Sequence, residues 1–92
     1  MNGSIPTELG SLTGLEEFWL SGLNFTGSTI PSELGRLSDL KILAIYDDNL
    51  AGPIPSELGQ LSDMNLLSID GNRLTGPVPS ELGRMPNMTW FL

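Results

Sequence analysis

This chain of 92 residues carries 11 acidic and 4 basic side chains, and its net charge of −7 would repel the phosphate backbone of a nucleic acid. It has neither cysteine nor histidine, which excludes disulfides, thiolate or imidazole metal sites, and the usual nucleophile–base pairs of catalysis. No segment approaches the roughly 20 apolar residues that a membrane span requires, and the N-terminus lacks the pattern of a signal peptide.

One six-residue pattern recurs along the chain. Ile-Pro-x-Glu-Leu-Gly begins at Ile5, Ile30 and Ile54 and returns with a valine at Val78, in steps of 25, 24 and 24 residues. The extra residue of the first step lies between Gly27 and Ile30, and we expect it to bulge from a loop. The repeats predict a single array over residues 1–92, divided into 5–29, 30–53, 54–77 and a partial repeat, 78–92.

The same register aligns seven columns of apolar residues, which we predict to form the core. The columns are Ile5/Ile30/Ile54/Val78, Leu9/Leu34/Leu58/Leu82, Leu12/Leu37/Leu61/Met85, Leu15/Leu40/Met64/Met88, Phe18/Leu43/Leu67/Phe91, Leu20/Ile45/Ile69 and Phe25/Leu50/Leu74.

Each repeat opens with a segment typical of a short helical turn, such as Pro31-Ser-Glu-Leu-Gly35. Proline fits the first position of the turn, glutamate favours its positive end, and glycine suits its stop. The four repeated glutamates are therefore interpreted as helix-start carboxylates: Glu8, Glu33, Glu57 and Glu81.

A short strand is predicted after each helical turn. Leu43 and Ile45 are two residues apart, so both side chains point to the core, while Ile42, Ala44 and Tyr46 point to the outer face. A strand that returns in the same direction every 24 residues needs a crossover connection, so the sheet should be parallel, with strands about 4.8 Å apart.

The consensus Leu-x-x-Leu-x-Leu-x-x-Asn-x-Leu-x-Gly-x-Ile-Pro resembles the plant-type leucine-rich repeats, found in the ectodomains of plant receptor-like kinases and in polygalacturonase-inhibiting proteins. The resemblance spans essentially the whole chain, and Gly-x-Ile-Pro distinguishes this subclass. It implies an α/β solenoid: a right-handed coil with a parallel β-sheet on the concave face and short helical or 3-10 turns on the convex side. It also implies a second small sheet at Gly-x-Ile-Pro.

In this family, an asparagine side chain links successive turns through hydrogen bonds to the backbone. The matching positions here are Leu23, Asp48 and Asn72, so only the third repeat has the family residue, and Asn24 and Asn49 are displaced by one position. Because Leu23 has no polar side chain, we expect the first turn to be less regular.

Both ends of the chain cut through repeats, since the start matches the tail of a repeat and Phe91-Leu92 falls inside a strand. Solenoids usually close their terminal turns with capping units, which in this family carry cysteine. We therefore expect a piece of a longer array. The alternative is a natural short chain whose open end turns associate with copies of itself.

The outward strand positions form the predicted ligand-binding face. Their three columns are Glu17/Ile42/Leu66/Trp90, Trp19/Ala44/Ser68/Leu92 and Ser21/Tyr46/Asp70. Aromatic residues carry much of the binding energy at interfaces, and an apolar patch often marks a contact surface. In the family, ligands often dock on this concave surface. The candidate site comprises Trp19, Ile42, Tyr46, Leu66 and Trp90, rimmed by Glu17, Asp47 and Asp70. The alternatives are that scattered exposed apolar residues are ordinary, or that this face meets another copy of the chain.

Catalysis is not expected, because the adjacent carboxylates of Glu16-Glu17 and Asp47-Asp48 would point to opposite faces of a strand and could not converge on one bond. A Ca²⁺ site from Asp47, Asp48 and Asp70 is conceivable, but a solvated acidic edge is the preferred interpretation, so no metal or cofactor is predicted. Three Asn-x-Ser/Thr triplets are candidate glycosylation sites: Asn2, Asn24 and Asn87.

The predicted function is non-catalytic recognition of a protein or peptide ligand by part of a cell-surface, receptor-like or secreted protein. The family resemblance implies an extracellular or cell-surface location and a role in signalling. No contact with nucleic acid or membrane is expected from this segment. One alternative is a structural solenoid that self-associates through its open ends, and another is an inhibitor of a secreted polysaccharide-degrading enzyme.

Overall fold

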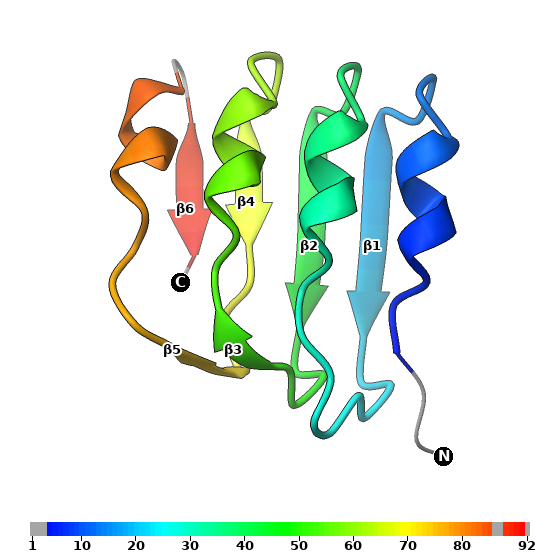
Figure 1. The fold of residues 1–92 in the computed structure, drawn as a ribbon, viewed down its shortest axis with the longest axis vertical. Coiled ribbons are helices and arrows are strands. Elements are labelled where there is room, and N and C mark those ends of the chain that lie inside the picture. The colour runs from blue at the N-terminus through cyan, green and yellow to red at the C-terminus, as the bar shows by residue number, and fades with distance from the viewer. Residues whose placement is uncertain (1–3, 86–87, 92) are drawn as a thin grey trace.

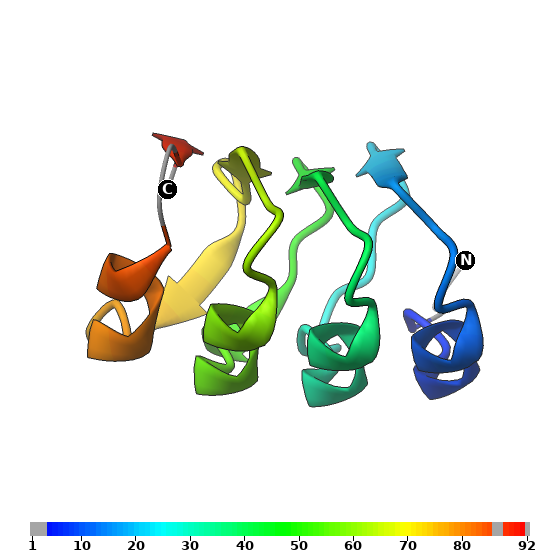
Figure 2. The same cartoon turned by 90° about the horizontal axis from the view of Figure 1, so that it is seen from above.

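The computed structural model describes residues 4–85 and 88–91, which form two layers (Figures 1 and 2). Parallel strands form one layer, in the order β1-β2-β4-β6, and a row of short 3-10 helices lies opposite. The strands are β1 (Glu17–Ser21), β2 (Ile42–Tyr46), β4 (Leu66–Ser68) and β6 (Thr89–Phe91). The helices are η1 (Thr7–Ser11), η2 (Ser32–Arg36), η3 (Ser56–Gln60) and η4 (Ser80–Arg84). The predicted parallel sheet and short helical turns are confirmed.

Each 3-10 helix begins one residue later than predicted. Pro31 precedes η2 with extended backbone angles, φ −66° and ψ 134°, and its carbonyl accepts the first bond from the Leu34 N–H at 3.2 Å. The proline is therefore the N-cap and not the first helical residue. This placement is possible because an N-cap needs only a carbonyl that accepts the first bond, which proline supplies without an N–H.

The apolar columns form one continuous core in the middle of the stack. Their members in the second and third repeats are almost all completely buried, among them Leu34, Leu43 and Leu67. Two predicted column members of the described structure are exposed, Leu12 by 50% and Val78 by 47%, and several others are partly buried. Each of the two exposed residues belongs to an outer turn of the described structure, so a neighbouring turn covers it on one side only. No helix among the described residues is long and apolar enough to cross a membrane.

The asparagine position links the turns as the family resemblance implied. Asn72 Oδ1 accepts hydrogen bonds from the backbone N–H groups of Asp48 and Leu50, both at 3.1 Å. Its Nδ2 donates to the carbonyls of Ile45 and Ile69, at 2.7 and 3.0 Å. One amide therefore satisfies two donors and two acceptors across neighbouring turns.

Asp48, one repeat earlier, performs only part of this role. Its Oδ1 accepts from the Leu23 N–H at 2.7 Å, but Oδ2 has no hydrogen-bond partner in the described structure, although the residue is completely buried. Leu23 itself is 48% exposed and contributes no side-chain bond. The side-chain hydrogen bonds made at this position therefore decrease in number from the third repeat towards the first.

A second, two-stranded parallel sheet joins the repeat tails through β3 (Ala51–Pro53) and β5 (Arg73–Thr75). It stops at β3 although the Ala51 N–H donates to the Ser28 carbonyl at 2.8 Å. The inserted residue of the first step lies at Ser28-Thr29, where no strand forms. The second sheet therefore lacks a strand from the first repeat, at the place where the extra residue is inserted.

The register of β6 differs from the predicted alignment by one residue. Thr89 lies opposite Leu66 and Trp90 opposite Leu67, whereas the alignment placed Trp90 opposite Leu66. The backbone also differs at Met85, whose ψ is 119° where the equivalent Leu37 has 74°. A residue that precedes proline prefers extended angles, and Pro86 follows Met85 in the sequence.

Candidate ligand-binding face

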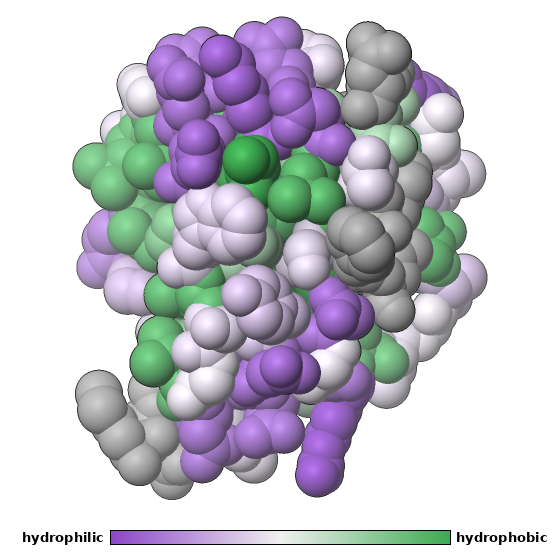
Figure 3. Space-filling view, turned by 180° about the vertical axis from the view of Figure 1, so that it is seen from behind, coloured by the Kyte–Doolittle hydropathy of each residue, from purple (hydrophilic) through white to green (hydrophobic). Residues whose placement is uncertain are grey.

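The outward side chains of β1, β2 and β4 form one surface, which we call the sheet face. It consists of Glu17, Trp19, Ser21, Ile42, Ala44, Tyr46, Leu66 and Ser68. The strand register confirms the first two predicted columns as far as β4 and the Ser21–Tyr46 pair of the third. Figure 3 looks onto this face, with green and pale atoms across its middle and hydrophilic atoms towards both ends.

Trp19 is the most exposed aromatic group on the sheet face. Its side chain is 52% exposed, and its indole Nε1–H donates to Glu17 Oε1 at 3.0 Å. The hydrogen bond limits the rotation of the ring while about half of the residue's surface faces solvent. An aromatic group held in this way loses little conformational entropy when a ligand covers it.

The remaining apolar residues form a flatter floor beside Trp19. Ile42, Tyr46 and Leu66 are partly buried, and Ala44, opposite Trp19, is completely buried although its position points outward. The expectation that every outward position would face solvent is therefore wrong for Ala44. The larger side chains around it cover its small side chain, and the side chain of Trp19 projects beyond it into solvent.

Acidic groups border the sheet face where its strands end. Asp47 and Asp70 are exposed on successive turns, and the Asp47 N–H donates to the Asp70 carbonyl at 3.2 Å. Ser68 Oγ donates to Asp70 Oδ1 at 2.8 Å, which orients that carboxylate. The left-handed backbone of Asp47, with φ 58°, turns the chain away from the sheet at this rim.

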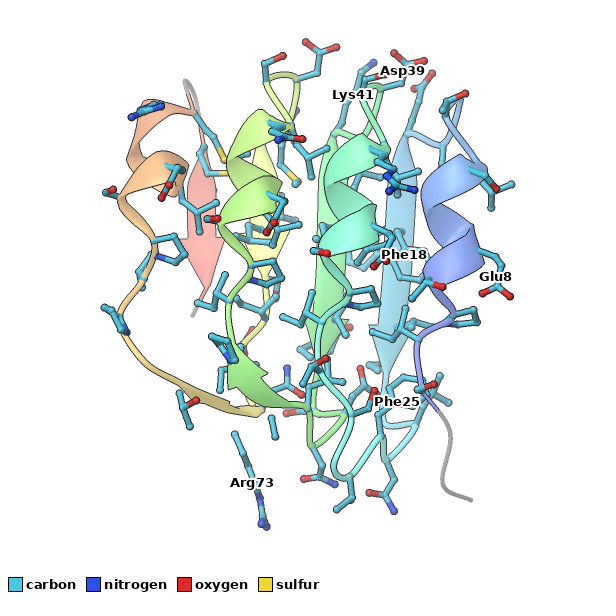
Figure 4. All side chains as sticks on the ribbon, in the orientation of Figure 1. Glu8, Phe18, Phe25, Asp39, Lys41 and Arg73 are labelled. Carbon is cyan, nitrogen blue, oxygen red and sulfur yellow. The ribbon has the colours of Figure 1, made fainter. Side chains whose placement is uncertain are left out.

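No basic side chain of the described structure forms a salt bridge with this rim. Lys41 lies at the opposite edge, where the strands begin, and pairs with Glu16 at 3.5 Å. Arg73, the first residue of β5, extends from the lower edge of the molecule in Figure 4, which is the edge where the strands end, but it forms no salt bridge with Asp47 or Asp70 in the described structure. Arg36 and Arg84 belong to the 3-10 helices η2 and η4 in the opposite layer. The sheet face therefore combines an apolar centre with a negative border.

Four predicted site residues need separate mention. The backbone of Trp90 lies in β6, but its position opposite Leu67 takes it out of the predicted column, and its side chain is outside the described structure. Asn2 and Asn87 are also outside the described residues, while Asn24 is exposed in the loop after β1.

The conceivable calcium site does not assemble. Asp48 is completely buried, whereas Asp47 and Asp70 are exposed. Within residues 4–85 and 88–91, no group of three or more acidic, histidine or cysteine side chains is placed to hold a metal ion.

Sequence reasoning did not predict a hollow of about 510 Å³ on the tail side of the first two repeats. Hydroxyl groups and prolines line it, including those of Ser4, Thr29 and Pro53. The inserted residue at Ser28-Thr29 lies at its wall, beyond the edge of the second sheet at β3.

Comparisons with known proteins agree with this architecture. A family model described as Leucine Rich Repeat matches residues 64–85. The ectodomain of the Arabidopsis receptor kinase HAESA is 37% identical, with a TM-score of 0.88, over 98% of this chain and 15% of that one. The ectodomain of the Arabidopsis thaliana receptor kinase GASSHO1/SCHENGEN3 is 38% identical, with a TM-score of 0.82, over 98% of this chain and 11% of that one. The chain belongs to the plant-type leucine-rich repeat family.

The family includes members with different ligands. HAESA was solved with an N-terminally extended IDA peptide hormone, and GASSHO1/SCHENGEN3 with CASPARIAN STRIP INTEGRITY FACTOR 2. A plant ice-binding protein is 34% identical, with a TM-score of 0.88, over 95% of this chain and 28% of that one. No curated protein matches the chain. This leucine-rich repeat chain thus spans well under a third of each of these structures.

Proposed function

We propose that this chain is a non-catalytic recognition module whose sheet face binds a protein or peptide, at the cell surface or outside the cell. It would serve a receptor-like or secreted protein, with a role in signalling. The observation that carries the proposal is Trp19, an indole 52% exposed yet held by Glu17 beside an apolar floor. The peptide hormone bound by the HAESA ectodomain supports the class of ligand.

The charge of the sheet face favours a particular kind of ligand. Aromatic anchors such as Trp19 dominate binding energy when a partner covers them, and the surrounding groups select the partner. With acidic groups at Glu17, Asp47 and Asp70, the complementary ligand has apolar side chains next to basic ones. The chain's overall net charge of −7 would accelerate the approach of such a ligand.

The sheet face does not suit a periodic ligand such as ice, although one structural relative binds ice. A crystal lattice presents the same groups at every step, so a matching surface needs the same side chain in every turn. Here each column changes in chemical type: Glu17/Ile42/Leu66, Trp19/Ala44/Ser68 and Ser21/Tyr46/Asp70. An irregular surface of this kind supports the recognition of one shaped molecule.

Selection from a displayed peptide library tests this proposal. We expect the chain to enrich peptides that combine basic and apolar residues, and Trp19→Ala to weaken their binding by about 30-fold, equivalent to the ~2 kcal/mol typical of a central anchor. Val78→Ala is the matched control, since Val78 is 47% exposed but far from the sheet face, and binding should be unchanged. Selected peptides that bind Trp19→Ala as tightly as the parent would contradict the proposal.

Self-association is a second candidate, favoured by the two outer turns. A Cβ added to Gly10, Gly35 or Gly59 would lie only 2.5 to 2.8 Å from the glutamate of the next turn, whereas one on Gly83 would meet nothing within 4 Å. In a head-to-tail stack, Glu8 of a second copy could therefore pack against Gly83 as the glutamates of the inner turns pack against Gly10, Gly35 and Gly59. Such a stack would also cover the exposed apolar side chains of the first turn.

Light scattering over a wide range of concentration, with circular dichroism on the same samples, separates the two candidates. A folded monomer throughout would refute self-association and leave the sheet face for an outside partner. If the mass rises with concentration, Gly83→Val should reduce that rise while the monomer stays folded.

A further inference from the structure

Asn24 occupies an exposed position that the backbone holds firmly. It lies three residues after the end of β1 and has a left-handed φ of 50°, which turns the chain into the repeat tail. Phe25, the next residue, is partly buried against the core, and its N–H donates to the Asp48 carbonyl. The loop is therefore fixed on both sides of an outward asparagine.

The two ends of the Asn24 side-chain amide are used differently. Oδ1 accepts hydrogen bonds from Asn49 Nδ2, at 3.0 Å, and from the Thr26 hydroxyl. Within the described part of the chain, no hydrogen bond is donated by Asn24 Nδ2. Asn72, in contrast, uses its Nδ2 to bridge the Ile45 and Ile69 carbonyls. Substitution at the nitrogen of Asn24 therefore breaks no described hydrogen bond.

Asn24-Phe25-Thr26 also has the Asn-x-Thr spacing that N-glycosylation requires. We propose that Asn24 is an N-glycan acceptor, a modification that depends on secretion and not on any ligand at the sheet face. The donor is an oligosaccharide linked through a diphosphate to a lipid. A bond forms between the first sugar carbon and Nδ2, the bond from that carbon to the diphosphate breaks, and the amide nitrogen loses one proton.

The fold accommodates the oligosaccharide in a defined place. Substitution at Nδ2 leaves Oδ1 free to keep both of its hydrogen bonds, so the link from Asn24 to the next turn survives. The glycan projects beside Leu23, which is 48% exposed, and screens that apolar side chain from other molecules. It borders the end of the sheet where Ser21 lies and leaves Trp19 uncovered.

The experiment uses the complete chain secreted from a eukaryotic cell behind a cleavable signal peptide. Cleavage after glutamate separates the three candidate sites, because residues 1–8, 18–33 and 82–92 each contain one of them. We expect the 18–33 fragment to carry a glycan that peptide N-glycosidase removes, leaving aspartate at position 24. Thr26→Ala should abolish this modification, and Thr26→Ser should retain it.

The thermal midpoint provides the second measurement. The glycosylated chain should melt at the same temperature as the enzymatically deglycosylated one, whose aspartate keeps an oxygen in the place of Oδ1. An unmodified 18–33 fragment from secreted, folded chain overturns the proposal, whatever the other two fragments carry. Modification of the 18–33 fragment that persists in Thr26→Ala also overturns the proposal. A glycosylated chain that melts well below its deglycosylated form would show that the fold does not accommodate the glycan.

Discussion

Replacing Asp48 by asparagine should stabilise the protein. Asp48 is completely buried, and its Oδ2 has no hydrogen-bond partner among the described groups, whereas Asn72 at the equivalent position satisfies all of its polar atoms. An amide at position 48 places an N–H donor where that oxygen now lies. The acceptors equivalent to those of Asn72 are the Leu20 and Ile45 carbonyls, one repeat earlier.

The magnitude follows from the groups that change. A buried polar atom without a partner costs about 1–3 kcal/mol, and each new hydrogen bond contributes about 1 kcal/mol net. We expect Asp48→Asn to raise the free energy of unfolding by about 1–3 kcal/mol. For a domain of this size, each kcal/mol raises the melting temperature by about 4–8 °C.

Thermal and denaturant unfolding followed by circular dichroism measure this change. Asp63→Asn removes the same charge from an exposed turn and should alter stability by less than about 0.5 kcal/mol. The reverse substitution, Asn72→Asp, should destabilise the chain, since the carboxylate cannot donate to Ile45 and Ile69. If Asp48→Asn is no more stable than Asp63→Asn, the unpartnered oxygen is not a cost and the reasoning fails.

Two further predictions concern the packing between turns. A Cβ on Gly35 would lie 2.5 Å from the Glu57 carbonyl oxygen, so Gly35→Ala should lower the free energy of unfolding by about 1–3 kcal/mol, while Gly83→Ala, with open space around it, should leave the denaturation midpoint unchanged. Leu67 is completely buried, so Leu67→Ala should cost about 2–5 kcal/mol in urea unfolding, whereas Leu12→Ala, at a side chain 50% exposed, should cost much less. Equal losses within either pair would contradict the stacking described here.

The sequence predicts the repeating interior well because each inward residue must match its counterparts one turn away. The two-residue spacing of Leu43 and Ile45 and the 24-residue step were sufficient for the strands, their direction and the buried columns. The same columns could not show that Leu12 and Val78 would be exposed, since exposure depends on the number of neighbouring turns and not on residue type.

Two details of the site lay beyond the repeat pattern for different reasons. The β6 register differs from the alignment after Met85, whose extended ψ matches the preference of a residue that precedes proline, a local effect that an alignment of leucines does not weigh. Ala44 was assigned correctly to the outer face, but its complete burial depends on the size of the side chains around it. Sequence spacing gives the direction of a side chain, while its exposure is a property of its neighbours.

The contrast between the two faces of β2 explains why the fold is easier to predict than the ligand. Inward positions are occupied by similar apolar residues in every turn, because a mismatch would leave a cavity or a clash between turns. Outward positions carry no such restriction, so Trp19, Ala44 and Ser68 follow one another in a single column. This freedom lets a regular stack present an irregular surface. A ligand that recognises the sheet face must therefore recognise the differences between repeats, and Trp19, which has no aromatic counterpart at Ala44 or Ser68, is the largest of these differences.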